Sequence, residues 1–136
     1  RIVAKRTLLE SILRTRALVE QGKLKAHPDF LGTDLGDLLE ICNGCGAKDS
    51  KLPIPDTIWG LWIGPVCNLH DFRYHVGKTK QDKEMADIEM LANNMRAIEA
   101  CSTWILKPLR RRRALTYYGV VTDLGDSAFW KGKERP

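Results

Sequence analysis

The sequence predicts a small, single-domain, all-α protein. Its 136 residues are one domain's length and suffice for one hydrophobic core. Hydrophobic residues make up 43% and charged residues 29% of the chain, which is ordinary for a globular protein and unlike a disordered one. Apolar residues recur at helical spacing, and Gly, Pro and Thr stand where helices begin or end. We therefore expect one helical domain over residues 1–136.

Two helices are expected in the N-terminal third. An apolar stripe predicts an amphipathic helix from Ile2 to Glu20, with Gly22 as its stop. Thr33 is placed to cap a short second helix from Asp34 to Ile41. The apolar side chains of this second helix are expected to face the core: Leu35, Leu38 and Leu39.

A long loop follows, from Cys42 to Trp59, rich in Gly, Lys, Asp and Pro. Loops of this length in compact domains are often functional. It ends in the most apolar segment of the chain, Ile58 to Ile63. This segment is either a buried strand-like connector or a hydrophobic rim that meets lipid through Trp59, Leu61 and Trp62.

Two helices are predicted in the centre of the chain. Pro65 suits the first turn of a helix that runs to Val76, and Thr79 can cap the next, from Lys80 to Cys101. The connection between them is short, so the two helices should run antiparallel. One stripe on the longer helix is expected to enter the core: Met85, Ile88, Leu91, Met95 and Ile98.

A last helix is expected from Leu109 to Leu124, after Pro108 and before Gly125. Arg110 to Arg113 cover every side of one turn, so this run is either a solvated surface or a binder of phosphate in lipid or nucleic acid. The neighbouring tyrosines are candidates to pack inward and support Asp87: Tyr117 and Tyr118. Ala128 to Trp130 should pin the tail to the body, leaving residues 131–136 mobile.

The charge balance points to an anionic partner surface. The net charge is +5 and the isoelectric point about 9.1. Nucleic acid, an acidic membrane and an acidic protein all fit this charge. No apolar run approaches the ~20 residues that a membrane-spanning helix needs.

The segment around His70 carries the chemistry. Cys67, His70 and Tyr74 are spaced three and four apart, so they share one face of the predicted helix, while Asp71 lies about 100° around its axis. A histidine can serve as a general base, and a neighbouring carboxylate can hold a second group beside it.

This pattern resembles the active-site helix of the phospholipase A2 superfamily, Cys-x-x-His-Asp-x-x-x-Tyr. Asn43-Gly44-Cys45-Gly46 looks like the calcium loop of that family, and Ala86-Asp87 like the dipeptide whose Asp orients the histidine. The pattern is also similar to small phage and prophage proteins of this superfamily. The resemblance covers roughly residues 39–95.

The resemblance implies a calcium-dependent hydrolase that cleaves the sn-2 ester of phospholipids, in a fold with two antiparallel active-site helices and a calcium loop. His70 would be the base, Asp87 its orienting partner, Tyr74 a donor to Asp87, and the Gly46 N–H a contact for the oxyanion. The implied calcium ligands are the Asp71 carboxylate and the backbone carbonyls of Gly44, Gly46 and Lys48. The loop departs from the family where Lys48 follows Ala47 in place of glycine, with Asp49 a substitute ligand.

The cysteines leave two alternatives open. Cys42-x-x-Cys45 and Cys67-x-x-His70 have spacing acceptable for a structural zinc site in a module that binds nucleic acid or protein. In the phospholipase interpretation, Cys45 bonds to Cys67, and Cys42 and Cys101 are candidates for a second bridge. Two disulfides would favour a secreted, virion-associated or otherwise oxidising location.

A further hypothesis for the whole domain is an inactive phospholipase-like protein that only binds membranes.

Overall fold

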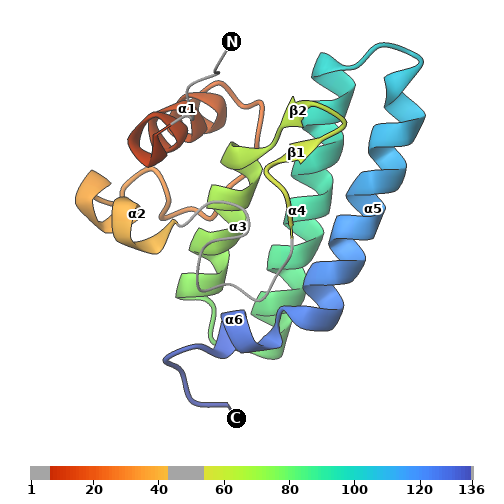
Figure 1. Cartoon of the computed structure of the whole chain (residues 1–136). Coiled ribbons are helices and arrows are strands. Elements are labelled where there is room, and N and C mark those ends of the chain that lie inside the picture. Colours follow the sequence, from red (N-terminus) through yellow and green to blue (C-terminus); the bar gives the residue numbers. More distant parts are fainter. Residues whose placement is uncertain (1–6, 43–53, 136) are drawn as a thin grey trace.

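The computed structural model describes residues 7–42 and 54–135 (Figure 1). That part of the chain is mostly helical, as the sequence predicts, and contains one two-stranded hairpin. The elements in order are α1 (Leu8–Glu20), α2 (Leu35–Ile41), β1 (Thr57–Ile58), β2 (Leu61–Trp62), α3 (Gly64–Val76), α4 (Lys80–Cys101), α5 (Leu106–Leu124) and α6 (Asp126–Trp130). The first five residues of the helix predicted from Ile2 lie outside the described residues.

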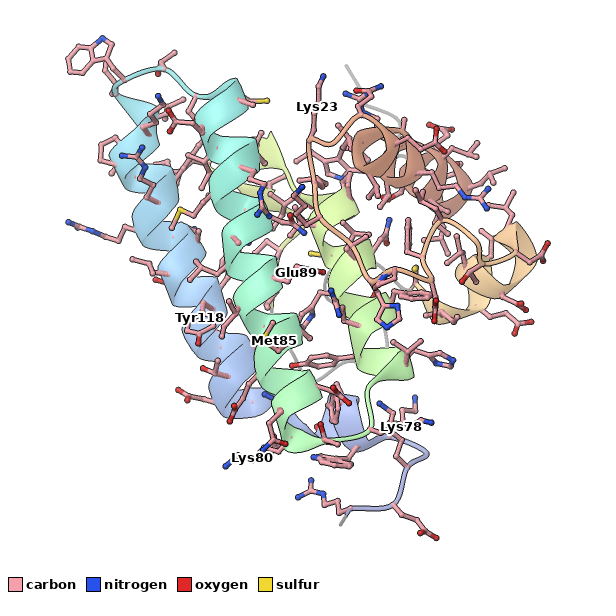
Figure 2. The ribbon with its side chains drawn as sticks, turned by 180° about the vertical axis from the view of Figure 1, so that it is seen from behind. Lys23, Lys78, Lys80, Met85, Glu89 and Tyr118 are labelled. Atoms are coloured by element: carbon pink, nitrogen blue, oxygen red, sulfur yellow. The ribbon has the colours of Figure 1, made fainter. Side chains whose placement is uncertain are left out.

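Helices α3, α4 and α5 form the centre of the fold (Figure 1). Each runs opposite to the one before it, and α1 and α2 cover the other side of α3 (Figure 1). The expected antiparallel return from α3 to α4 is therefore present. An ion pair at 2.8 Å joins Arg73, in the last turn of α3, to Glu89 of α4, which is labelled in Figure 2.

Two predicted helix starts differ from the structure. The last long helix, α5, begins at Leu106, three residues before the predicted Leu109, with Pro108 in its first turn. Thr79 caps α4 as predicted, and its hydroxyl and the Asp82 side chain form a reciprocal capping box. The cap of α2 is Asp34, whose carboxylate accepts from the Gly36 N–H, and not Thr33. Thr33 instead donates its hydroxyl to the carbonyl of Asp29 at 2.7 Å, which removes it from the helix end.

The buried face of α4 differs from the predicted apolar stripe. Met85 and Ile88 are exposed, on the outer side of the helix, where Figure 2 shows Met85. The buried residues are mostly polar or small: Lys83, Ala86, Asp87, Met90, Asn93, Asn94 and Ile98. Because Lys83 and Asp87 occur four apart, both turn inward together, and Met85 and Ile88 are rotated away from that face. The face of α4 that is buried therefore depends more on its polar contacts than on the spacing of its apolar residues.

Buried asparagines tie the N-terminal region to this centre. Asn68 of α3 donates its side-chain N–H groups to Ser11 at 2.8 Å and Thr15 at 3.1 Å, both on α1. Asn93 of α4 pairs with both backbone groups of Lys25, at 2.8 and 2.9 Å. These contacts fix α1 and its following loop because a buried amide that loses its partner carries a desolvation cost.

The hairpin is held by α5. Its turn is Trp59-Gly60, with φ angles of 47° and 78°, the left-handed pair that a tight antiparallel hairpin requires. Glycine adopts this conformation freely, whereas a non-glycine residue such as Trp59 is strained by about 1–2 kcal/mol. Helix α5 supports the hairpin through Tyr117, which donates its hydroxyl to the Thr57 carbonyl at 2.8 Å. Tyr117 thus packs inward as expected, but it does not reach Asp87.

Arg110 is the second support from α5, and the expected solvated arginine run is wrong at this position. Its side chain is buried and donates to the Trp59 carbonyl at 2.8 and 3.3 Å, the Cys101 carbonyl at 3.1 Å and the Ser102 hydroxyl at 2.9 Å. Arg110 therefore joins the hairpin to the C-terminal end of α4, because it satisfies acceptors on both.

We expect Arg110→Ala to lower the free energy of unfolding by about 2–3 kcal/mol, since hydrogen bonds from a charged donor contribute about 1.5–3 kcal/mol each and several acceptors lose their partner together. Arg112→Ala, at the exposed position two residues on, should stay within about 0.5 kcal/mol of wild type. Urea denaturation of both variants measures the difference. Equal stabilities would show that Arg110 does not hold the hairpin.

Candidate active site

His70 and Asp87 meet in the interior between α3 and α4. The His70 Nε2 atom lies 2.7 Å from the Asp87 Oδ1 atom, and both side chains are buried. His70 stands in the middle of α3 and Asp87 two turns into α4. The antiparallel return of α4 brings the two residues together, which is the contact that the resemblance implies.

The Asp87 carboxylate receives three side-chain donors. Tyr74 donates its hydroxyl to Oδ1 at 2.7 Å, and Lys83 donates its ammonium to Oδ2 at 2.8 Å, in addition to the His70 contact. Burial alone would raise the pKa of Asp87, but the hydrogen bonds from His70, Lys83 and Tyr74 outweigh it and hold the pKa below its ordinary value. The carboxylate is therefore ionised and can only accept hydrogen bonds.

The ionised carboxylate sets the state of the imidazole ring. Since Asp87 cannot donate, the hydrogen between the two groups belongs to the His70 Nε2 atom. In the neutral ring the other nitrogen, Nδ1, then carries a lone pair. Nδ1 makes no hydrogen bond within residues 7–42 and 54–135. The arrangement presents one basic nitrogen of a ring whose tautomer is fixed.

Tyr74 lies against His70 and is enclosed by the C-terminal segment. Its ring centre is 4.1 Å from that of His70 and 5.3 Å from that of Phe129, which meets it edge-on. Burial and the charge of Asp87 raise the pKa of Tyr74, so it stays a phenol and a donor. Gly125 permits this packing, because a Cβ atom there would collide with the Tyr74 hydroxyl.

Lys83 is the residue of this cluster that the sequence reasoning did not find. Its buried ammonium also donates to the carbonyls of Val121 at 3.1 Å and Thr122 at 3.4 Å, so it links Asp87 to the end of α5. The available signal was the spacing of four between Lys83 and Asp87. That spacing is more often a solvated surface pair, and here it is buried because the last turn of α5 supplies carbonyl acceptors.

Asp71 occupies the side of α3 next to the start of the predicted calcium loop. Burial and the charge of Asp71 together raise the pKa of the Cys42 thiol to about 12, and Cys42 is the last described residue before the segment 43–53. The thiol donates to the Asn68 carbonyl of α3 at 3.4 Å. The segment thus begins beside the α3 turn that carries Asp71. The other predicted loop residues lie outside the described residues: Gly44, Cys45, Gly46, Lys48 and Asp49.

The second predicted disulfide is absent. Cys42 and Cys101 are both free, the first buried at the end of α2 and the second exposed at the end of α4. The hydrogen bond to the Asn68 carbonyl turns the Cys42 thiol toward α3. The thiol therefore points away from the C-terminal end of α4, where Cys101 lies. The expected bridge from Cys67 to Cys45 remains a prediction because Cys45 is outside the described residues.

The three residues predicted at a lipid interface differ in exposure. Trp59 is about half exposed, whereas Leu61 and Trp62 are partly buried. The Trp62 ring fills the space beside Gly64, where a Cβ atom would lie 2.6 Å from it. Trp59 at the hairpin turn therefore offers more indole surface to a lipid phase than Trp62.

Comparisons with known proteins add no relative. No family model matches the sequence, and no curated protein or solved structure is significantly similar to it. Among the described residues, no group of three or more His, Cys, Asp or Glu side chains is arranged to hold a metal ion. In the same part of the chain, no helix combines the length and hydrophobicity needed to cross a membrane.

We predict that Asp87 makes the stability of the fold depend on acid pH. Its pKa is lower in the folded protein than its ordinary value of 3.8, so its contribution is full above that value and is lost as pH falls through the folded pKa. At neutral pH, Asp87→Asn should cost about 3–5 kcal/mol, because buried Lys83 loses its counter-ion.

Urea denaturation of both proteins at several values of pH between neutral and about pH 3 measures this difference. The gap between wild type and Asp87→Asn should shrink toward the acid end. A gap that stays constant would show that Asp87 is not held as a carboxylate by its three donors.

Proposed function

We propose that the protein is a calcium-dependent hydrolase of the phospholipase A2 type, which cleaves the sn-2 ester of glycerophospholipids. The observation that carries the proposal is the 2.7 Å contact between the His70 Nε2 and Asp87 Oδ1 atoms. It occurs between the two residues that the sequence motif selects, on two antiparallel helices, with Tyr74 bound to the same oxygen. A surface His-Asp pair would need none of these contacts.

His70 acts as the general base in this proposal. Its Nδ1 atom accepts a proton from a water molecule as that water attacks the ester carbonyl, while Nε2 keeps its hydrogen toward Asp87. The ring becomes an imidazolium, which the Asp87 carboxylate stabilises. The proton then passes from Nδ1 to the departing alkoxide oxygen, which leaves as the alcohol and restores the neutral ring.

Lys83 and Tyr74 act through Asp87 as positioning residues. Each donates a hydrogen bond to the carboxylate, one at Oδ2 and one at Oδ1, so the carboxylate cannot rotate away from the histidine. Lys83 also balances the charge of Asp87, which makes the cluster neutral while the imidazole is neutral. This lowers the cost of burying the carboxylate, which would be several kcal/mol for an unpaired ion.

The residues near Asp71 suit a hard cation such as calcium. Calcium prefers carboxylate and carbonyl oxygens, and the proposed set needs only one side chain, Asp71, with backbone carbonyls of Gly44, Gly46 and Lys48. The half-buried position of Asp71, beside the place where that segment begins, supports this assignment. Calcium bound there would polarise the ester carbonyl and neutralise the charge that develops on its oxygen, together with the Gly46 N–H.

The test is fatty-acid release from phosphatidylglycerol vesicles whose two acyl chains differ, so that the released acid identifies the ester position. Wild type should release the sn-2 acid with calcium and not with a chelator. His70→Ala should lose at least about a hundredfold, because general-base catalysis is worth about 10²–10⁴-fold. His75→Ala is the matched control, since His75 is exposed on the same helix, and it should keep full activity.

The Asp71→Asn variant should need more calcium than wild type for half-maximal release of the fatty acid, because the site loses a charged ligand.

No release by wild type under any condition would refute the proposed function. Activity of His70→Ala equal to that of His75→Ala would refute the role of His70. Stoichiometric zinc in the purified protein, with no release, would favour the zinc-stabilised binding module instead.

A further inference from the structure

Exposed apolar side chains gather at the end of the molecule where α4 turns into α5. Trp104 is 83% exposed and Ile105 58% exposed, and both lie in the connection between the two helices. The connection is well ordered by Thr103, whose backbone carbonyl accepts from the Lys107 N–H and whose hydroxyl accepts from the Leu106 N–H. The structure thus holds a large indole out into solvent on a defined turn.

The tip of the β-hairpin belongs to the same end. Arg110 binds the Trp59 carbonyl with one side of its guanidinium, and the Cys101 carbonyl and Ser102 hydroxyl with the other. The Trp59 carbonyl is therefore held near the C-terminal end of α4, and the exposed Trp59 ring lies against Arg113 of α5. Figure 1 shows the hairpin lying across the half of α4 nearest this turn. We call the set of Trp59, Trp104 and Ile105 the apolar tip.

Basic residues follow the α4–α5 turn along α5. From Glu99 to Arg113 the sequence has one acidic residue and five basic ones: Lys107, Arg110, Arg111, Arg112 and Arg113. Glu99 pairs with Lys107 and Arg111, and buried Arg110 is used internally. Arg112 and Arg113 are exposed, and the Arg113 guanidinium lies 5.4 Å from the centre of the Trp59 ring. This end therefore combines indole rings with an excess of positive charge.

We propose that the apolar tip docks the protein onto anionic phospholipid membranes. Tryptophan is favoured at the headgroup level because its ring is apolar while its N–H stays hydrated, and arginines nearby attract lipid phosphates. The tip consists of two short turns, one of the hairpin and one between α4 and α5, and each carries an exposed tryptophan that can insert shallowly into lipid. The inference rests on the proposed function for its choice of lipid as the partner.

The α4–α5 turn of the apolar tip is distant from the cluster of His70 and Asp87. Cys101, at the end of α4, is fourteen residues beyond Asp87, or about 21 Å along the helix at 1.5 Å per residue. Changes at the apolar tip should therefore leave the chemistry on a dissolved substrate unchanged. They should act only where the enzyme must first attach to a lipid surface.

The experiment measures vesicle binding with hydrolysis switched off. Co-sedimentation with phosphatidylglycerol vesicles is followed for the His70→Ala protein in chelator, so that no substrate is consumed. Adding Trp104→Ala and Ile105→Ser should weaken binding by about tenfold or more, since the inserted apolar area is lost. The matched control adds Met85→Ala and Ile88→Ala, which remove exposed apolar side chains elsewhere on α4 and should change nothing.

Three results would overturn the proposal: no binding before the tip is altered, binding unchanged by the tip substitutions, or equal loss in the control. Binding that depends on the tip but ignores lipid charge and salt would overturn the role of the arginines. A dissolved, monomeric short-chain phospholipid separates the two proposals. Hydrolysis of it without vesicle binding refutes docking alone, and vesicle binding without any hydrolysis by wild type refutes the proposed function alone.

Discussion

The buried carboxylate of Asp87 is the constraint on which the rest of the structure depends. An ionised group is retained in a protein interior only when its charge is balanced and its oxygens are bonded. Asp87 meets both conditions through donors from two helices, His70 and Tyr74 of α3 and Lys83 of α4. Lys83 in turn needs the last carbonyls of α5, so the same charge fixes the positions of three helices.

Several features of packing follow from that constraint. The face of α4 that carries Lys83 and Asp87 must turn inward, which leaves Met85 and Ile88 outside. The end of α5 must approach Tyr74 closely, which requires a residue without a side chain at Gly125. The C-terminal segment then closes over the cluster, with Phe129 against Tyr74 and Lys133 bound to the Tyr74 carbonyl. The tail predicted to be mobile therefore contains an anchoring contact.

The sequence was informative where one residue type has one structural use. Pro65, Thr79 and the short connection after α3 predicted the central helix pair, and the motif predicted which residues would meet across it. It was less informative about charged side chains, because Lys83 and Arg110 become buried only through acceptors on elements far away in the chain. Their environment depends on tertiary packing, which neither residue periodicity nor local spacing encodes. The proposed calcium ligands in residues 43–53 stay predictions for a different reason, as they lie outside the described residues.

The central claim is that Asp87 fixes the His70 ring with its hydrogen on Nε2 and a basic Nδ1. Nitrogen-15 NMR of protein labelled at histidine distinguishes the two tautomers, and a His70→Ala sample assigns the signal among the three histidines. In the neutral form of the ring, we expect the His70 proton on Nε2, and averaging between the two tautomers when Asp87 is replaced by Asn. A proton on Nδ1, or averaging already in the wild-type protein, would contradict it.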